Sequence, residues 1–382
     1  MNRRPGAAAE SAEASGEAVI LAINAGSSSV KFGAFRNGAG LVRSIAGTIP
    51  PIRGLATASL DLLERQFDFR LVAAIGHRVV LSARRPATER VTAALLDMFR
   101  QAIARDPDHL PAQLALIEAF AERLPTVPQI ACYDSAFHDT MPRVARLLPI
   151  PRRFEAAGFQ RYGFHGLSCS YVVAELRRVA GAAAADGRVI VAHLGGGASV
   201  TAVRGGESVD TSMGFTPAGG LLMGTRPGDI DPGLALALME QDGLTAKGFD
   251  HLINHDCGLR GVSETSGEMR ELLARQRTDV RAAEAIELFC YQVRKWIGLT
   301  AAVLGGVETV VFAGGIGENV PEIRERACRE LGFLGIELDP TRNTANAAII
   351  STGTSRATVR IVRIDEELMI ARAVWQDRLA VA

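Results

Sequence analysis

The chain has 382 residues, 48% of them hydrophobic, so it can bury a large core, and a chain of this length more often forms two domains than one. Its 42 basic and 42 acidic residues cancel, so no overall field would attract nucleic acid or an anionic membrane, and any bound anion must meet a local site. The five cysteines are scattered without a Cys-x-x-Cys pair, which argues against a disulfide framework or a structural zinc site and indicates a reduced, cytoplasmic setting.

Two segments of the chain bear on targeting and membrane insertion. Residues 1–17 contain two arginines followed by small and acidic residues without an apolar stretch, so we expect a flexible N-terminal tail and no signal peptide. The most apolar stretch, 298–317, carries Glu308 and several glycines in its middle. It is therefore expected to be a buried helix-to-strand segment and not a membrane span.

An internal similarity organises the chain. Val19–Phe35 aligns without gaps with Val189–Gly205, 170 residues later, and six positions are identical. Each copy consists of an apolar segment, a turn of small residues and a second apolar segment, which is typical of two strands joined by a turn. The repeat predicts two versions of one α/β domain, although a chance match of two short apolar windows would look the same.

Helical and strand patterns alternate along the rest of the chain, as expected for layers of an α/β protein. Helices are predicted at 90–103, 114–123 and 282–304, and strands at 71–76, 129–133 and 309–312. The stretch 205–233 is rich in Gly, Pro, Thr and Asp and is too long for a simple connection, so it is expected to be a functional loop. Residues 181–187 are expected to form a surface loop.

Three turns of small residues follow apolar segments and are candidate phosphate sites. They are Asn24–Lys31, which ends in a lysine, His193–Ser199, which contains three consecutive glycines, and Ala313–Asn319. Backbone N–H groups and hydroxyls of such turns can approach phosphate oxygens closely, although none of the three is a Walker A motif. An ordinary hairpin turn would explain the first one equally well. Three such turns in one chain favour the phosphate interpretation.

Several polar residues stand in apolar or glycine-rich surroundings: His77 and Arg78, Asp134, His165, and the pair Arg226 and Asp229. Each could be a hydrogen-bonded residue beneath a loop, which is the commoner role for a single buried polar side chain. The segment around Arg226 and Asp229 is also consistent with a loop that holds an anion or a metal, or with a turn stabilised by aspartates.

Longer blocks of the sequence resemble a known family. They read NAGSSSVK at 24–31, GHRVV at 76–80, DSAFH at 134–138, RYGFHG at 161–166, HLG at 193–195, DTSMGFTP at 210–217, MGTRPGDIDPG at 223–233 and GGIGEN at 314–319. In wording and order these blocks resemble the acetate kinase family, and the resemblance extends from Val19 to the block DEELMIAR at 365–372.

The resemblance implies an α/β fold of two duplicated RNase H-like domains of the sugar kinase, Hsp70 and actin superfamily, with an ATP cleft between them. The first domain, on the acyl substrate side, would comprise residues 18–148 plus 365–382, with the C-terminal helix returning to it. The second, on the nucleotide side, would comprise residues 149–364. A homodimer is also implied. No nucleic acid or membrane partner is expected, because the basic and acidic residues cancel.

The resemblance also implies a role for individual residues. Asp134, His165 and Arg226 would be catalytic, Arg78 would bind the carboxylate, and Val80, Phe164 and Pro217 would line a small apolar pocket for the acyl group. Asn24 and Glu366 would hold Mg²⁺. ATP or ADP would contact Lys31, Ser27, Ser29, His193, Leu194, Gly195, Gly196, Gly197, Glu268, Met269, Arg270, Gly315, Ile316, Gly317, Glu318 and Asn319.

The sequence departs from the family pattern near the expected acyl pocket and nucleotide turn. Leu81–Ala83 replaces His-Gly-Gly, Gly196 replaces Asn, and Glu268 replaces Asp. Asp108 precedes His109 where the family has Leu. Asp108 would disfavour a bare methyl group if it lined the pocket, because burying an unpaired charge is costly. The interpretation we favour is that Asp108 points away from the pocket and is hydrogen-bonded at the start of the following helix.

The expected reaction is reversible phosphoryl transfer between ATP and acetate, giving acetyl phosphate and ADP. A carboxylate is already ionised at neutral pH, since free carboxyl groups titrate near roughly 4, so it needs no general base. Asp134 is therefore expected to position an arginine or the metal. A propionate or broader short-chain acyl kinase is the alternative, and an ATPase switch of the Hsp70 or actin kind is a distant one that has no use for Arg78, His165 and Arg226.

Overall fold

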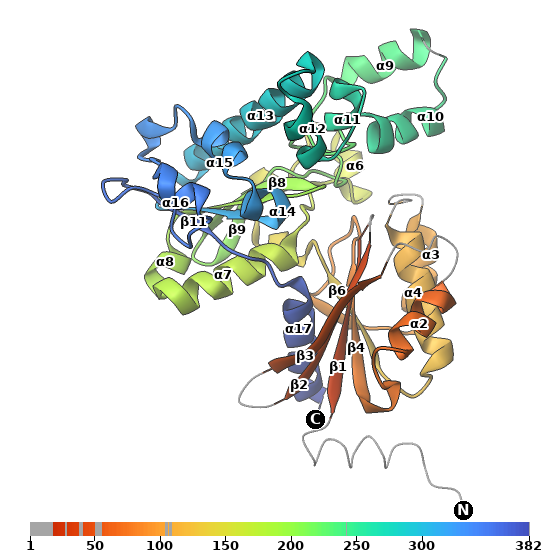
Figure 1. Ribbon diagram of the computed structural model, residues 1–382. Helices are drawn as coiled ribbons and strands as arrows, with labels where there is room; N and C mark the ends of the chain where they lie inside the picture. Colours follow the sequence, from red (N-terminus) through yellow and green to blue (C-terminus); the bar gives the residue numbers. More distant parts are fainter. Residues whose placement is uncertain are drawn as a thin grey trace, which may run out of the picture. The chain divides into compact units, whose positions relative to one another are not determined.

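The computed structural model describes residues 18–26, 29–37, 41–49, 56–103, 106, 109–241 and 243–381. The chain divides into two compact units (Figure 1), which we call unit 1 (residues 1–136 and 365–382) and unit 2 (residues 137–364). The first boundary lies after Ala136, whereas the sequence prediction placed it after residue 148. Residues 137–148 therefore belong to the second unit.

Unit 1 contains a six-stranded sheet in the order β3-β2-β1-β4-β6-β5. Its strands are β1 (Val19–Ala25), β2 (Val30–Asn37), β3 (Leu41–Ile49), β4 (Val72–Val79), β5 (Thr88–Arg90) and β6 (Gln129–Tyr133). β1 pairs antiparallel with β2 and parallel with β4, and β4 pairs parallel with β6. All seven residues of β1 are buried, as is typical of a strand that is covered on both faces.

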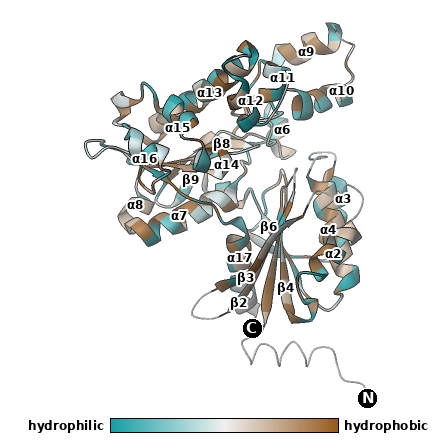
Figure 2. Cartoon of the chain, in the orientation of Figure 1, coloured by the Kyte–Doolittle hydropathy of each residue, from teal (hydrophilic) through white to brown (hydrophobic). Residues whose placement is uncertain are grey.

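Helices cover both faces of the unit 1 sheet. They are α2 (Ala56–Glu64), the 3₁₀ turn η1 (Phe69–Leu71), α3 (Ala93–Ala102), α4 (Leu110–Arg123) and α17 (Glu366–Val381). Leu60 of α2 and Phe120 of α4 pack with Leu21 and Ile23 of β1 in one apolar cluster. α17 lies close to the other face: a Cβ on Gly76 of β4 would be 2.5 Å from a methyl carbon of Ile370. Figure 2 shows β4, near the centre of this sheet, mainly in brown, the colour of hydrophobic residues.

Unit 2 contains a five-stranded sheet in the order β11-β10-β7-β8-β9. Its strands are β7 (Val189–Leu194), β8 (Ala198–Arg204), β9 (Glu207–Thr211), β10 (Thr309–Ala313) and β11 (Thr358–Ile361). β7, β8 and β9 form an antiparallel meander, and β10 and β11 add to it in parallel. Taken from β9 to β11, this spatial order, β9-β8-β7-β10-β11, matches the order β3-β2-β1-β4-β6 in unit 1. The match confirms the predicted duplication.

The helices of unit 2 include one long helix, α13 (Val280–Leu304), which begins where Asp279 accepts hydrogen bonds from the N–H groups of Arg281 and Ala282. α13 packs against β8, and α7 packs against β7. The other helices and turns are η3 (Ala136–Thr140), α5 (Arg143–Arg146), α6 (Arg152–Ala156), α7 (Gly166–Ala180), α8 (Ala182–Asp186), α9 (Pro232–Gln241), α10 (Ala246–His251), η4 (Leu252–Asp256), α11 (Gly258–Ser263), α12 (Met269–Arg275), α14 (Gly314–Asn319), α15 (Pro321–Cys328), η5 (Gly332–Leu334) and α16 (Pro340–Thr344).

Most predicted elements form where the sequence pattern placed them, and the differences are local. Residues 182–186 form the short helix α8 and not a loop, and the expected loop 205–233 begins with the strand β9. α4 begins at Leu110, before the predicted start at 114. Within the described part of the chain, no helix is long and apolar enough to cross a membrane.

A neutral histidine is buried in unit 1. His77 of β4 is 2% exposed, packs edge-on against Phe120, and its Nε2 lies 2.6 Å from Oε1 of Gln129. Because Oε1 of Gln129 is an amide oxygen and can only accept, Nε2 of His77 donates this hydrogen bond. Burial disfavours the charged imidazolium and lowers the pKa of His77 from 6.5 to about 4.

This pKa predicts acid sensitivity. Between about pH 6.5 and 4, His77 binds a proton in the unfolded chain but not in the folded chain. The free energy of unfolding is therefore unaffected by the ionisation of His77 above this pH range and falls as the pH drops through it. Between about pH 7 and 5 the wild type should lose about 2 kcal/mol more than His77→Asn in urea unfolding. His251→Asn, at an exposed histidine, should follow the wild type; equal losses in wild type and His77→Asn would contradict the prediction.

Candidate active site

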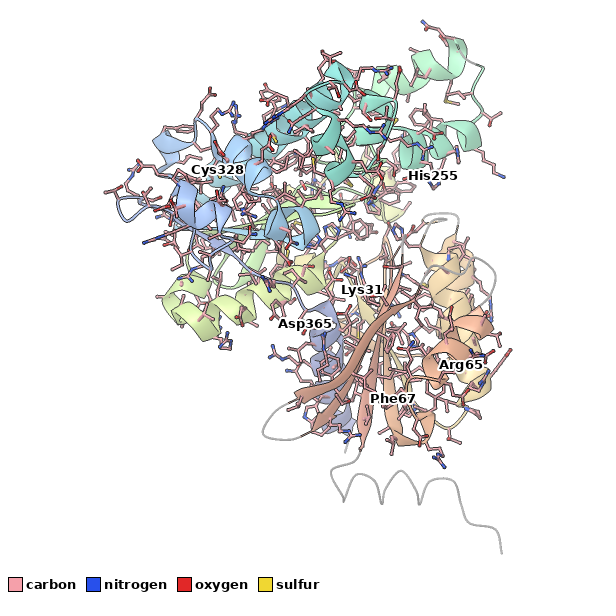
Figure 3. All side chains as sticks on the ribbon, in the orientation of Figure 1. Lys31, Arg65, Phe67, His255, Cys328 and Asp365 are labelled. Atoms are coloured by element: carbon pink, nitrogen blue, oxygen red, sulfur yellow. The ribbon has the colours of Figure 1, made fainter. Side chains whose placement is uncertain are left out.

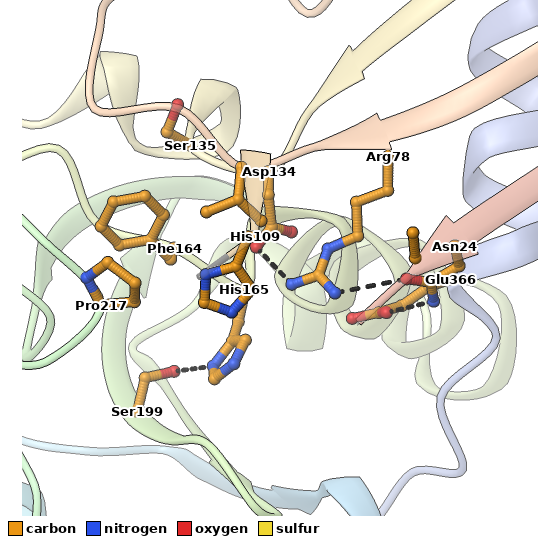
Figure 4. A network of polar contacts seen from close by, with 12 residues as sticks. Asn24, Arg78, His109, Asp134, Ser135, Phe164, His165, Ser199, Pro217 and Glu366 are labelled. Carbon is orange, nitrogen blue, oxygen red and sulfur yellow. Dashed lines mark hydrogen bonds and ion pairs between the residues drawn. The ribbon is translucent and has the colours of Figure 1, made fainter. Parts of the chain in front are cut away.

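A polar network lies at the carboxyl end of the central strands of unit 1 (Figure 4). Nη2 of Arg78 donates to Oδ2 of Asp134 at 2.8 Å, and Nη1 donates to Oδ1 of Asn24 at 3.2 Å. Nδ2 of Asn24 in turn donates to Glu366 at 2.8 Å and to Glu367 at 2.9 Å. One guanidinium and one amide thus connect three carboxylates.

The local fold explains why these side chains meet. Asn24 is near the end of β1, Arg78 near the end of β4, and Asp134 directly follows β6. β1, β4 and β6 are parallel, so their carboxyl ends lie at the same edge of the sheet. Glu366 is the first residue of α17, which packs on the face where Gly76 and, two residues on, Arg78 point.

The electrostatics of the network keep Arg78 charged. Burial by itself would lower its pKa, but Asp134 and Glu366 outweigh that effect and raise the pKa of Arg78 above its usual value. Asp134 is completely buried, and the Arg78 side chain is 13% exposed. Nε of Arg78 is buried and has no hydrogen-bond partner within the described residues. The two hydrogen bonds of Nη1 and Nη2 therefore fix the orientation of the guanidinium.

The turn from Asn24 to Lys31 is a tight connection between β1 and β2, in which N–H of Gly26 donates to the carbonyl of Ser29 at 2.9 Å. Ser29 is half-buried, and Lys31 is exposed. Figure 3 shows Lys31 at the same end of unit 1 as Asp365 and at the end opposite Phe67. Ser27 lies outside the described residues.

In unit 2, His165 and Arg226 meet at one glycine. A Cβ on Gly197 would lie 2.8 Å from Nη2 of Arg226 and 3.2 Å from Nε2 of His165, so only glycine leaves room for both. Nδ1 of His165 lies 3.0 Å from Oγ of buried Ser199, and its ring stacks on His193 at 4.2 Å. His165 adopts a left-handed conformation with φ 60°, which costs a non-glycine residue energy and is common at functional sites.

The glycine turns of unit 2 lie against one another. N–H of Gly224 donates to the carbonyl of Gly196 at 3.1 Å, and a Cβ on Gly267, just before α12, would be 2.7 Å from the carbonyl oxygen of Gly224. A Cβ on Gly314 would be 2.7 Å from the carbonyl oxygen of Leu194. The structure therefore brings together the three segments 193–197, 267–270 and 314–319, which are far apart in sequence.

The last of these segments is held by a buried arginine. Arg324 of α15 has 0% exposure and donates to the carbonyl of Gly317 in α14 at 2.8 Å, to the side chain and carbonyl of Asn343, both at 2.8 Å, and to Asn346 at 2.6 Å. No carboxylate forms an ion pair with it within the described part of the chain. Burial lowers the pKa of Arg324 to about 10, so it remains charged at neutral pH and fixes α14 through carbonyl dipoles.

Several predicted contact residues are more buried than a surface site would suggest. Leu194, Phe164, Val80 and Met269 have exposures of 0%, 1%, 2% and 3%. Gly196, Glu268, Arg270, Gly315 and Asn319 are exposed, and His193, Gly195, Gly197, Pro217 and Ile316 are half-buried. Oε1 of Glu318 accepts from the N–H groups of Gly314 and Ile364, both at 3.1 Å. Glu318 therefore helps to shape the turn. Pro217 accepts a hydrogen bond from Arg226 at 2.7 Å.

The sequence analysis missed four polar residues in or beside these groups: Glu367, Ser199, Gln113 and Asp106. Glu367 adjoins Glu366, but no pattern showed that Asn24 would bond both. Asp106 is 5% exposed, and its Oδ1 accepts from the backbone N of His109 at 3.2 Å and from Nδ1 at 2.9 Å. Asp108, which the sequence allowed either to line the acyl pocket or to point away from it, lies outside the described residues.

The unit 1 network fits a hard divalent cation. No group of three or more His, Cys, Asp or Glu side chains arranged for a metal occurs within the described residues. Mg²⁺, however, commonly uses one or two carboxylates together with substrate phosphates and water. Glu366 and the amide oxygen of Asn24 are oxygen groups of that kind, and the hydrogen bonds from Nδ2 of Asn24 to Glu366 and Glu367 hold these side chains in place.

The buried ion pair predicts a large stability effect at one residue. Asp134→Ala leaves the Arg78 guanidinium buried without its partner, which should cost about 3–5 kcal/mol in the free energy of unfolding. Asp97→Ala is the matched control, since Asp97 also pairs with an arginine of unit 1, at 2.6 Å, but is 64% exposed; it should cost less than about 1 kcal/mol. Urea unfolding measures both, and equal losses would contradict the prediction.

Comparisons with known proteins agree with this arrangement. The acetate kinase of Rhodopseudomonas palustris CGA009 is 44% identical over 317 residues, which are 82% of this chain and 79% of that protein. The acetate kinase of Bacillus subtilis 168 is 39% identical over 391 residues, 93% of this chain and 98% of that protein.

Solved structures give the same result. The Porphyromonas gingivalis acetate kinase superimposes with a TM-score of 0.81 at 33% identity, over 94% of this chain and 99% of that one. A propionate kinase from Francisella tularensis superimposes with a TM-score of 0.82 at 31% identity, over 93% of this chain and 98% of that one. These neighbours confirm the predicted fold class of two duplicated α/β domains. A model of the acetokinase family matches residues 52–372, and the chain belongs to that family.

Proposed function

We propose that this protein is an acetate kinase, which transfers the γ-phosphoryl group of ATP to acetate and catalyses the reverse reaction. The observation that carries the proposal is the buried, charged Arg78, held by Asp134 and Asn24, in a chain of the acetokinase family. Relatives named acetate kinase share 39% to 44% identity with it over most of its length.

The chemistry needs charge neutralisation more than acid or base catalysis. A carboxylate oxygen attacks the γ-phosphorus, the new O–P bond forms, and the bond from phosphorus to the β–γ bridging oxygen breaks as ADP leaves. No proton moves, because the acid is ionised at neutral pH. The protein therefore has to hold the reactants in line and to neutralise charge on the phosphoryl oxygens.

The two polar sets divide this work. Arg78 would bind the carboxylate of the acid, and Asp134 would fix the guanidinium and keep it charged. Arg226 and His165 would donate to the phosphoryl oxygens as their negative charge grows. The hydrogen bond between Nδ1 of His165 and Oγ of Ser199 fixes the orientation of the imidazole ring.

ATP is proposed to bind the adjoining turns of unit 2. The exposed glycines Gly196 and Gly315 offer backbone N–H groups without an obstructing side chain. Lys31, Ser27 and Ser29 are proposed to contact the phosphates from the β1–β2 turn. The remaining proposed nucleotide contacts are His193, Leu194, Gly195, Gly197, Glu268, Met269, Arg270, Ile316, Gly317, Glu318 and Asn319, of which Met269 and Leu194 can contribute only backbone atoms because their side chains are buried.

Mg²⁺ is the proposed metal, with Asn24 and Glu366 as its protein ligands. When bound, it would neutralise phosphate charge that the arginines alone do not cover. Asn24 holds Glu366 and Glu367 together through its amide. These two hydrogen bonds keep the two carboxylates near one point.

A propionate or broader short-chain acyl kinase is the close alternative, since a propionate kinase has the same fold at 31% identity. It would use the same charged residues, with Val80, Phe164 and Pro217 as the proposed lining of the acyl pocket. An ATPase switch without an acceptor would have no use for Arg78 and Arg226 and is not favoured.

We also propose a homodimer in the cytoplasm. In support, no residue of α9 is buried, although this helix is rich in leucine and Leu236 is 60% exposed, and such apolar surface is often covered by another subunit. None of the five cysteines forms a disulfide, which suits a reducing compartment. Light scattering of the purified protein tests the oligomeric state.

Trapping of the product tests the proposed activity. Purified protein with ATP, Mg²⁺ and acetate should form acyl phosphate, which hydroxylamine converts to a coloured hydroxamate. Replacing acetate by propionate or butyrate in the same assay ranks the acids. ATP hydrolysis that is independent of any acid, with no hydroxamate, would instead favour the ATPase switch.

Arg226→Ala should lower turnover in this assay on the order of 10³-fold, because it removes a charge that neutralises the transferring phosphoryl group. The fold, followed by circular dichroism, and ATP binding should persist. Arg78→Ala should lose as much turnover, but it also removes the arginine that pairs with buried Asp134 and will be less stable.

The matched control for both is Arg152→Ala, at an arginine of unit 2 that is 74% exposed and should retain wild-type turnover. If Arg226→Ala kept most of its turnover, its proposed role would be wrong.

A further inference from the structure

A buried glutamine joins the two strand ends that carry the unit 1 network. Gln113, in the first turns of α4, is 2% exposed. Its Oε1 accepts from the backbone N–H of Val80 at 3.0 Å, and its Nε2 donates to the backbone carbonyl of Ala25 at 3.2 Å. One side chain therefore connects positions that are separated in sequence by 33 and 88 residues.

The connection lies where the sheet no longer holds these strands together. Regular pairing of β1 with β4 ends at Ile23 and His77, so Ala25 and Val80 lie beyond the last paired residues. Their backbone polar groups are in a buried region, since both residues are at most 5% exposed, and buried backbone groups need partners. The Gln113 amide replaces the hydrogen bonds that the parallel ladder would otherwise provide.

Candidate site residues lie close in sequence to Ala25 and Val80, the two positions that Gln113 bonds and that we call the clamped positions. Asn24 precedes Ala25, and Arg78 is two residues before Val80. The bond from Arg78 to Asn24, at 3.2 Å, crosses between the same two strands. The spacing that Gln113 imposes on the backbones is therefore the spacing on which that side-chain bond depends.

We propose that Gln113 is a positioning residue, which sets the separation between the acid-binding end of β4 and the phosphate turn after β1 by bonding Val80 and Ala25. This proposal rests on the proposed function of Arg78 and of the Asn24–Lys31 turn. Gln113 does not touch the reactants; it acts through the two backbones. A misplacement of reacting groups by about 1 Å can cost on the order of 10²-fold in rate.

The test compares two buried glutamines. Gln113→Met has nearly the same volume but makes neither bond. Gln129→Met is the matched control, because Gln129 is 6% exposed and also makes two buried hydrogen bonds, to His77 and to the carbonyl of Ile117, none of them to the clamped backbones. Gln113→Asn is a milder second variant, since its amide is one methylene too short to bridge both positions.

The measured quantities are kcat, KM for acetate and for ATP, and the melting temperature. Gln113→Met should lower kcat about 10- to 100-fold and raise KM for acetate, with KM for ATP within about threefold of wild type, because the other proposed nucleotide turns belong to unit 2. Gln113→Asn should show the same pattern, with a smaller loss. Gln129→Met should lose stability to a similar extent, as expected for buried unpaired partners, but keep kcat within about twofold of wild type.

Two results would overturn the proposal: a folded Gln113→Met or Gln113→Asn with wild-type kcat and KM for acetate, or a loss of kcat in Gln129→Met equal to that in Gln113→Met. The wild-type protein is assayed in the same experiment, so that failure of the positioning role can be distinguished from failure of the proposed function. If wild type forms no acyl phosphate, the proposed function is wrong; if it does and the Gln113 variants match it, only the positioning role is wrong.

Discussion

The buried guanidinium of Arg78 is the constraint around which unit 1 is arranged. A charge that is largely removed from water must be paired and hydrogen-bonded to remain ionised. Asp134 supplies the countercharge, and Asn24 supplies an amide oxygen. Because Asn24 also bonds Glu366 and Glu367, the first turn of α17 belongs to the same network. The beginning of α17 thus completes an arrangement that starts in β1.

The duplicated sheet explains where polar side chains can collect in each unit. In both, a hairpin is followed by strands that pair parallel to its first strand, so the hairpin turn and the carboxyl ends of the added strands share one edge. Unit 1 uses this edge for a charged network. Unit 2 uses it for glycine turns, where His165 and Arg226 converge on Gly197, a residue without a side chain to exclude them.

Buried polar side chains that bond to backbone, such as Gln113 and Arg324, hold these edges in shape. Gln113 joins two strand ends beyond the sheet ladder, and Arg324 fixes α14 through the carbonyl of Gly317. Both donate to backbone carbonyl groups, Gln113 to that of Ala25 and Arg324 to those of Gly317 and Asn343. Both side chains are buried, and the loss of a hydrogen bond costs more in a buried region than in water.

The sequence by itself determined the strands, the turns and the duplication. An apolar run such as Val19–Ala25, followed by small residues, has few other stable conformations, and both copies formed the expected hairpins. The block patterns also identified the family, together with Arg78, Asp134, His165 and Arg226 as candidate residues. Local signals misplaced the start of α4 and missed the short elements α8 and β9, because such short segments are decided by packing and not by periodicity.

Only the tertiary structure decided which polar groups meet. Nothing in the sequence near position 113 showed that this glutamine would bond Val80 and Ala25, and the adjacent pair Glu366 and Glu367 gave no sign that Asn24 would bond both. The burial that keeps His77 neutral, and the carboxylates of Asp134 and Glu366 that keep Arg78 charged, likewise depend on elements far away in the chain. Hydrogen bonds and desolvation are set by distances in space, and sequence spacing fixes those distances only within a single helix or strand.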